Sequence, residues 1–449
     1  MTKFWRVGFF ILISFSASTW AQVRVHFDQP VGPPILGFGA QLNPYTYASP
    51  NWGDVTEENA KDFERKVIDL SPQFVRVFMV PGWKTGDPDG VNKQGNVGTW
   101  KSFLRTLRLA QTAGAHITLT TWFGEPMFPE KTAKTTAALL DDLINHEKIT
   151  AIKSINMMNE PDMDWPGEEN WTTEEYNRMY RTLDAELKRL GLRDRLMIVA
   201  GDMVEDYQPK WQKNIADHLA DIIDGVSIHA YWKYNKTDWM LHRLGDTKKM
   251  AATQPSIRDK PFFVTEFGSQ GLTNGNSKDE PWQDKEGHPI CETTTQAMQI
   301  GWFNMEALNR GFSGTVQWDM ADVAYDRHMH YGVIGEPKKG WPLKPAYFVL
   351  KMLTHTVGPG FRVVKVGGGI PDGLACALVG PKGEKAVYLL NRSAKQQKVL
   401  VDGFRSGMKL KQMIWNGDGA GHLEEKQIDG AGEMRIDLPA KGIVAFLSK

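Results

Sequence analysis

The chain repeats one local pattern: a short apolar strand, a polar strand end, a loop and an amphipathic helix. We predict eight such strands, with starts roughly 29 to 52 residues apart, at 37–43, 74–79, 116–122, 152–160, 196–202, 225–231, 262–267 and 314–319. This spacing leaves room for one helix after each strand. The clearest helices are predicted at 56–70, 100–113, 172–190, 293–310 and 344–353. Eight strand–helix units are typical of an α/β protein built as a (β/α)8 TIM barrel.

The alternative is a doubly wound sheet, which would need a glycine-rich phosphate loop after the first strand, and no such loop follows Asn43. After Gly360 the pattern changes to short alternating strands separated by Gly and Asp/Asn turns, which predicts a small antiparallel β-sandwich. We therefore divide the chain into four parts. They are a signal peptide at 1–21, an N-terminal strand at 22–30 expected to pack on the sandwich, the barrel at 31–357 and the β-sandwich at 358–449.

The N-terminus has the pattern of an export signal. Lys3 and Arg6 precede an apolar run over 7–15, and small residues then lead to Ala21. The apolar run is too short to span a bilayer. We expect cleavage after Ala21, a secreted or periplasmic protein, and no membrane association after cleavage.

Composition narrows the range of partners. The 53 basic and 53 acidic residues balance, which argues against a nucleic-acid partner because such proteins usually present a basic face. The 16 tryptophans suit stacking on sugar rings, although some will belong to the core. Cys291 and Cys376 fall in different predicted domains, so their pairing stays open, and they provide no metal framework. The sequence gives no indication of oligomeric state.

Two predicted strands end in a glutamate. The fourth ends in Asn159-Glu160-Pro161, where the proline lacks an N–H and stops the strand. The seventh ends in Glu266, followed by Phe267 and Gly268. Because active sites of barrels lie at the carboxyl ends of the strands, this pattern predicts an enzyme with two facing carboxylates.

Other strand ends also carry unusual polar or aromatic residues. They are Arg76 on the second strand, His229 and Tyr231 on one face of the sixth, and Trp318 on the eighth. Together with Asn159-Glu160-Pro161 and Thr265-Glu266-Phe267-Gly268, they make the chain resemble the retaining glycoside hydrolases of the large (β/α)8 clan whose catalytic glutamates end strands four and seven. The family within that clan stays open among endo-glucanase, glucuronoxylanase/glucosylceramidase and xylosidase/iduronidase types.

The resemblance implies a role for each matched residue. Glu160 would be the acid/base and Glu266 the nucleophile, with the carboxyl groups about 5–5.5 Å apart. Arg76 and Tyr231 would keep Glu266 ionised, Asn159 would bind the sugar 2-hydroxyl, and Trp318 would be the platform under the sugar. The further residues expected to contact substrate are His229, Trp122, Glu125, Trp165 and Trp282.

The expected protein is thus a secreted retaining β-glycoside hydrolase that cleaves a polysaccharide, of β-glucan or xylan type and from within the chain. An exo-acting β-glycosidase, a transglycosylase and a non-catalytic glycan-binding barrel are the alternatives. Glu125, Asp202, Asp319 and Asp322 are further acids near strand ends, of which Glu125 is the best rival. His328-x-His330 lacks a carboxylate framework, so we interpret it as a solvated or substrate-binding loop; no metal and no cofactor is implied.

Overall fold

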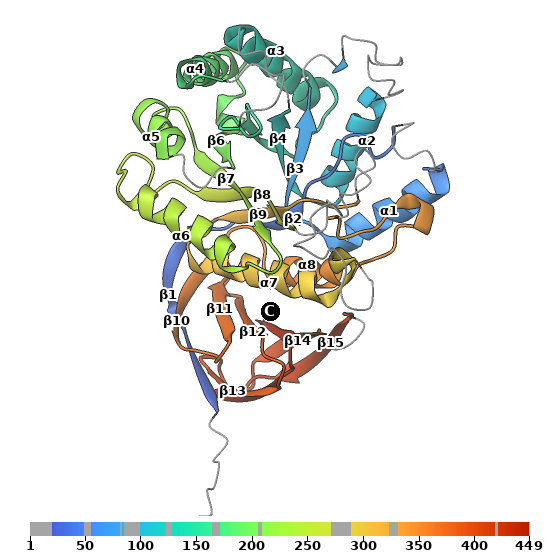
Figure 1. Cartoon of the computed structure of the whole chain (residues 1–449), viewed down its shortest axis with the longest axis vertical. Coiled ribbons are helices and arrows are strands. Elements are labelled where there is room, and N and C mark those ends of the chain that lie inside the picture. The colour runs from blue at the N-terminus through green and yellow to red at the C-terminus, as the bar shows by residue number, and fades with distance from the viewer. Residues whose placement is uncertain are drawn as a thin grey trace, which may run out of the picture.

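The computed structural model describes residues 20–48, 55–80, 83–84, 99–122, 128–163, 171–204, 209–270, 289–322, 331–417 and 421–448. They form a barrel surrounded by helices and a separate β-sheet domain packed beneath it (Figure 1). The predicted fold class is therefore confirmed. All but two residues of the predicted signal peptide lie outside the described residues, as do Glu125, Trp165, Trp282, His328 and His330.

The barrel has eight parallel strands in the order β2-β9-β8-β7-β6-β5-β4-β3. The strands are β2 (Gly37–Ala40), β3 (Phe74–Met79), β4 (His116–Thr121), β5 (Ile152–Asn156), β6 (Met197–Met203), β7 (Gly225–Lys233), β8 (Phe262–Gln270) and β9 (Gly314–Gln317). A parallel bridge between Leu42 and Val77 closes the sheet from β2 to β3. Each predicted barrel strand matches one of these within a few residues.

Among the described residues, eight α-helices follow the strands: α1 (Glu57–Leu70), α2 (Thr99–Thr112), α3 (Pro129–Asp141), α4 (Thr173–Arg189), α5 (Pro209–His218), α6 (Asp238–Ala252), α7 (Thr294–Asn309) and α8 (Pro345–Thr356). Short helical turns are η2 (Asp142–His146), η3 (Arg193–Arg195), η4 (Ile290–Glu292) and η5 (Pro337–Lys339). Thr172 and Glu175 form a capping box that fixes the start of α4. No described helix has both the length and the apolar character needed to cross a membrane.

The second domain is a nine-stranded sheet in the order β15-β14-β17-β12-β11-β10-β1-β13-β16. The strands are β1 (Ala21–Pro34), β10 (Arg362–Gly368), β11 (Gly373–Val379), β12 (Lys385–Asn391), β13 (Gln397–Asp402), β14 (Lys409–Asn416), β15 (Leu423–Asp429), β16 (Glu433–Leu438) and β17 (Gly442–Ser448). The N-terminal β1 pairs antiparallel with β10 and parallel with β13. The other pairings are antiparallel.

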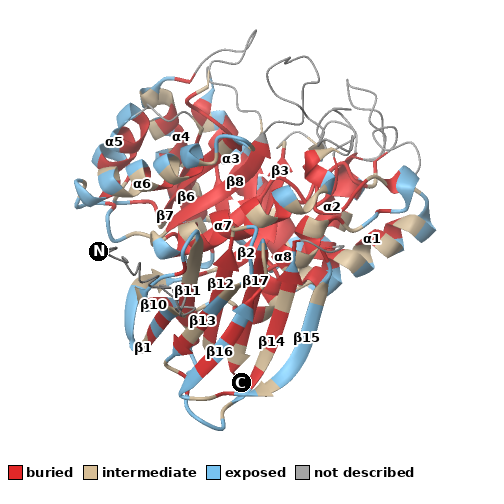
Figure 2. Cartoon of the chain, turned by 60° about the horizontal axis from the view of Figure 1, so that its bottom comes forward, coloured by how far each residue is buried: buried red, intermediate tan, exposed pale blue. Residues whose placement is uncertain are grey.

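Helices α7 and α8 join the two domains. Figure 2 shows buried residues running from the barrel strands through these helices into the sheet. Gly301 in α7 allows this close approach, because a Cβ there would lie 2.5 Å from Ile443 Cδ1 of β17. Cys291 and Cys376 are both buried and unpaired. The sheet domain thus packs against the outer helices α7 and α8, and the open end of the barrel is the face where the strands terminate.

Candidate active site

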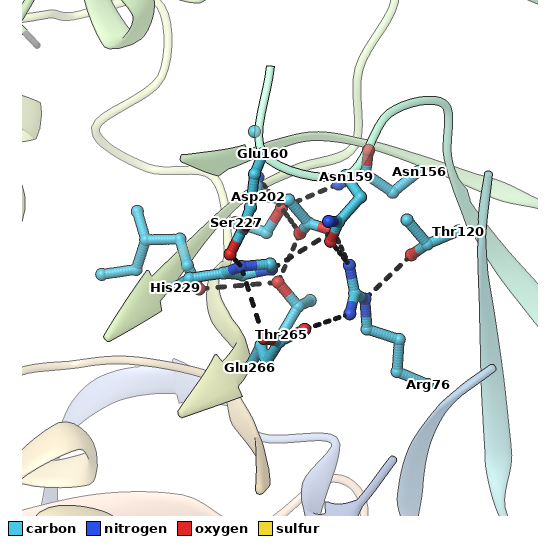
Figure 3. Close-up of polar contacts among 12 residues, drawn as sticks. Arg76, Thr120, Asn156, Asn159, Glu160, Asp202, Ser227, His229, Thr265 and Glu266 are labelled. Carbon is cyan, nitrogen blue, oxygen red and sulfur yellow. Dashed lines mark hydrogen bonds and ion pairs between the residues drawn. The ribbon is translucent and has the colours of Figure 1, made fainter. Parts of the chain in front are cut away.

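Glu160 and Glu266 meet at this open end of the barrel (Figure 3). One carboxylate oxygen of each lies within 4.8 Å of the other. Glu266 sits on β8 beside His229 of β7, and Glu160 follows the end of β5 with a left-handed backbone, φ 47°. The two residues are 7% and 6% exposed, so most of their surface is withdrawn from water. The sequence-based expectation that the two carboxyl groups lie face to face thus agrees with the structure.

Arg76 lies fully buried beneath the two glutamates and uses all five of its N–H donors. The acceptors, at 2.6 to 3.0 Å, are Gln41 Oε1, Thr120 Oγ1, Asn159 Oδ1, Asp202 Oδ2 and Glu266 Oε2. Burial works against the charged guanidinium, but Asp202 and Glu266 outweigh it and raise the pKa of Arg76. Arg76 is therefore a permanent cation with no donor left for a substrate, and it orients the groups around it.

His229 connects Glu160 to Asp202. Its Nδ1 lies 2.8 Å from Glu160 Oε1, and its Nε2 lies 3.5 Å from Asp202 Oδ2. Burial opposes the charged imidazolium, but Glu266 and Asp202 prevail and raise the pKa of His229 to about 10. The ring is thus protonated at neutral pH, and its Nδ1–H donates to Glu160.

Asp202 is the anion that ties these groups together, and its role did not emerge from the sequence. Besides Arg76 and His229, it accepts hydrogen bonds from Ser227 Oγ at 2.7 Å and from Thr265 Oγ1. Burial opposes its charge, yet Arg76 and His229 together lower the pKa of Asp202 below its ordinary value. Its two oxygens, on β6, therefore organise groups on three other barrel strands, β3, β7 and β8.

A glycine explains how the chain delivers Asp202 to this position. Gly201 has φ 135° and Asp202 has φ 55°, so the end of β6 turns through two left-handed residues. A Cβ on Gly201 would lie 2.0 Å from the backbone oxygen of Ser227. Only glycine fits there. The Gly201-Asp202 pair at a strand end was the sequence signal that could have indicated a functional residue.

Glu266 accepts hydrogen bonds on both of its oxygens. Arg76 donates to Oε2 at 2.6 Å, and the Tyr231 hydroxyl donates to Oε1. Burial raises the pKa of Glu266, and the neighbouring Glu160 also raises it, whereas His229, Arg76 and Tyr231 lower it; the net direction is upward. Burial and the charge of Glu266 raise the pKa of Tyr231 well above 10, so Tyr231 remains a donor.

An aromatic cluster lies at the same end of the barrel. It contains Phe78, Trp318 and Tyr331, with Trp122 and Tyr231 packed against them. Trp122 stacks on Phe78 with ring centroids 4.8 Å apart, and Trp318 meets Phe78 edge-on at 5.9 Å. Trp122 and Trp318, both predicted to contact substrate, thus belong to one aromatic cluster.

Two further tryptophans pack into the barrel. Trp171 is 8% exposed and belongs to the main core. Trp83 packs edge-on against Tyr45 and Phe103, each at a centroid distance of 5.5 Å. Both rings support the barrel rather than project from it.

Glu160, His229 and Glu266 bring three potential metal-ligand atoms within 4.8 Å of one another. A metal ligand must offer an unprotonated nitrogen or oxygen. His229 is protonated, and its Nδ1 is already bonded to Glu160. Arg76 places a second positive charge on Glu266. These residues fit acid/base chemistry better than they fit a metal ion.

Comparison with solved structures finds glycoside hydrolases with the same architecture. A GH30 endoxylanase from Clostridium papyrosolvens C71 matches with a TM-score of 0.68 and 15% identity, covering 96% of this chain and 100% of that chain. A GH51 α-L-arabinofuranosidase from Thermotoga petrophila RKU-1 matches with a TM-score of 0.72 and 14% identity, again covering 96% and 100%. No protein-family model and no curated protein matches the chain. At these identities the likeness confirms, at the level of the fold, the resemblance carried by the strand-end motifs.

Proposed function

We propose that this protein is a retaining glycoside hydrolase in which Glu160 is the acid/base and Glu266 the nucleophile. The observation that carries the proposal is that one oxygen of each carboxylate lies within 4.8 Å of the other across the barrel mouth. Retaining enzymes hold their carboxyl groups about 5–5.5 Å apart, whereas inverting enzymes leave about 6.5–9.5 Å for a water molecule.

The surrounding charges support this division of roles. Two cations, Arg76 and His229, face two anions, Asp202 and Glu266, and so balance them. Both oxygens of Glu266 already accept hydrogen bonds, one of them from a group that never loses its proton. Both hydrogen bonds favour the ionised form of Glu266, which the nucleophile role requires, and the proposal gives the acid role to Glu160.

In the first step, a carboxylate oxygen of Glu266 forms a bond to the anomeric carbon while the bond to the leaving oxygen breaks. Glu160 gives its proton to that leaving oxygen. In the second step, Glu160 takes a proton from water, and the water oxygen replaces Glu266 at the anomeric carbon. The sugar leaves with its original anomeric configuration, and both carboxyl groups return to their starting states.

Neighbouring groups would position the sugar. Arg76 Nη2 donates to Asn159 Oδ1, which leaves the Asn159 amide N–H₂ as the donor available to the sugar 2-hydroxyl. Such a bond strengthens in the transition state. Trp318, held in the aromatic cluster, would present its ring to the apolar face of the sugar.

We further propose that the substrate is a polysaccharide of β-glucan or xylan type, cleaved from within the chain by a secreted enzyme. The motifs at the strand ends, the export-type N-terminus and the likeness to an endoxylanase support this. Release of single arabinofuranosyl units is the second candidate, since α-L-arabinofuranosidases match with equal or higher TM-scores.

The test is a substrate panel. It comprises xylan, mixed-linkage β-glucan, mannan, galactan and arabinan, together with aryl β-xyloside, β-glucoside and α-L-arabinofuranoside. New reducing ends from a polymer support internal cleavage, whereas release of monosaccharide alone supports exo action. The absence of hydrolysis across the panel would contradict the proposal.

Two variants separate the roles of the glutamates. Glu266→Gln should lose activity on every substrate because no nucleophile remains. Glu160→Gln should lose roughly 10²–10⁴-fold on natural glycosides but much less in the first step with a dinitrophenyl glycoside, whose leaving group needs no proton. Equal losses on both substrates would contradict the acid role of Glu160.

A further inference from the structure

Four large apolar side chains of the described residues are exposed: Val31, Ile68, Phe128 and Trp239. The two aromatic ones, Phe128 and Trp239, are 47% and 43% exposed. Phe128 is the N-cap residue of α3, and Trp239 is the second residue of α6. Helices of a barrel begin on the face where the strands end. Both exposed aromatic rings thus lie on the face that holds Glu160 and Glu266.

The aliphatic pair lies elsewhere. Ile68 is near the C-terminal end of α1, which faces the opposite end of the barrel, and Val31 is in β1 of the sheet domain. A single exposed apolar residue needs no explanation. Two exposed aromatic rings confined to the active-site face are different, because aromatic rings can stack on a ligand.

Trp239 is connected to the site by a short, fully described segment. Tyr231, which donates to Glu266, lies eight positions earlier. Two tight turns shorten the path: Lys236 N–H donates to Lys233 O at 2.8 Å, and Trp239 N–H donates to Lys236 O at 3.2 Å. Even fully extended, eight residues would span at most about 28 Å. Trp239 is therefore within reach of a glycan chain several units long.

The surroundings of Trp239 suit a sugar better than an apolar partner. Asn235, Lys236 and Asp238 beside it are all exposed and polar. A sugar ring has an apolar C–H face, which an indole can cover, and hydroxyl groups at its edge, which amide, ammonium and carboxylate groups can bind. An apolar protein partner would instead favour an uninterrupted apolar patch.

We propose that Trp239, together with Phe128 at a separate point of the rim, is an outer contact for a polysaccharide that extends beyond the sugar held between the two glutamates. This inference rests on the proposed function and extends it, because outer contacts on the rim favour a long-chain substrate over a short glycoside.

Affinity electrophoresis through gels containing xylan, mixed-linkage β-glucan or arabinan tests binding without catalysis. The Glu266→Gln protein is the reference, and Trp239→Ala, Phe128→Ala and Ile68→Ala are each added to it. At least one polymer should retard the reference, and Trp239→Ala should weaken that retardation about three- to tenfold, with a smaller effect for Phe128→Ala. Ile68→Ala, an equally exposed residue on the far face, should match the reference.

Kinetics in the otherwise unaltered protein give the second readout. Trp239→Ala should lower the ratio of polymer to aryl-glycoside kcat/KM by the same factor, mainly through KM. The inference is overturned if no polymer retards the reference, if Trp239→Ala matches Ile68→Ala, or if Trp239→Ala instead changes the oligomeric state in size-exclusion chromatography. If retardation depends on Trp239 but the wild-type protein hydrolyses no substrate of the panel, the proposed function is overturned and the glycan contact at Trp239 stands.

Discussion

Replacing Asp202 with asparagine should damage both stability and catalysis, because this one carboxylate holds two buried cations. Its Oδ2 accepts from Arg76 at 2.7 Å and lies 3.5 Å from His229 Nε2, and all three side chains are fully buried. Removing one partner of a buried ion pair typically costs 3–5 kcal/mol. The free energy of unfolding of Asp202→Asn should fall by about that amount, which lowers Tm by roughly 3–5 °C in a chain of 449 residues.

The catalytic effect follows from the same contacts. Asp202 fixes Arg76, which bonds Glu266 and Asn159, and supports the protonated His229, which bonds Glu160. A hydrogen bond to a charged group contributes about 1.5–3 kcal/mol. Loss of that energy in the transition state alone would lower kcat roughly 10- to 150-fold. KM should change little, since Asp202 is too deeply buried to meet substrate.

The assay compares kcat, KM and thermal unfolding of wild type, Asp202→Asn and Thr265→Val. Thr265→Val removes one neutral donor to the same carboxylate and should cost only about 0.5–1.5 kcal/mol. Because folding lowers the pKa of Asp202, its stabilising effect is present above the unfolded value of about 3.9 and disappears as pH falls through the folded value. An Asp202→Asn protein with the Tm and kcat of Thr265→Val would refute the reasoning.

For three further substitutions the structure predicts the direction of the effect on stability or on the pH profile. Asp319 is buried with neither carboxyl oxygen hydrogen-bonded, and burial raises its pKa well above the usual value. The free energy of unfolding of the wild type should therefore fall as pH rises above about 3.9, the pKa of an unfolded aspartate. In urea, Asp319→Asn should be more stable than the wild type, by a margin that grows up to about 1.4 kcal/mol per pH unit. Gly201→Ala should destabilise by about 3 kcal/mol or more, because its Cβ would strike the Ser227 backbone, and calorimetry checks this. Tyr231→Phe removes a hydrogen bond that lowers the pKa of Glu266, so the acidic limb of the kcat/KM profile should move to higher pH.

The barrel was predictable because its strands are short apolar runs at strand-plus-helix spacing, a pattern that is visible in the sequence itself. β15 was not predicted, because its residues are mostly exposed and show no apolar alternation. Helices α3, α5 and α6 were not named among the clear helices; α3 runs into a π-helical turn, and α5 has only 10 residues. Elements stabilised by tertiary packing leave weak local signals.

The two glutamates were predictable because each ends a strand, and a barrel brings all strand ends to one face. Arg76 was found for the same reason, but its five acceptors, on separate parts of the chain, were not. Asp202 was noted only as an acid near a strand end. Its importance depends on the left-handed turn at Gly201 and on distances across the barrel, neither of which a sequence pattern contains.

The most direct test of the two-glutamate mechanism is the anomeric configuration of the first product, followed by proton NMR during hydrolysis of an aryl glycoside. The separation within 4.8 Å predicts double displacement, so the product should appear first with the configuration of the substrate and mutarotate afterwards. A first product of inverted configuration would contradict the assignment of Glu266 as nucleophile.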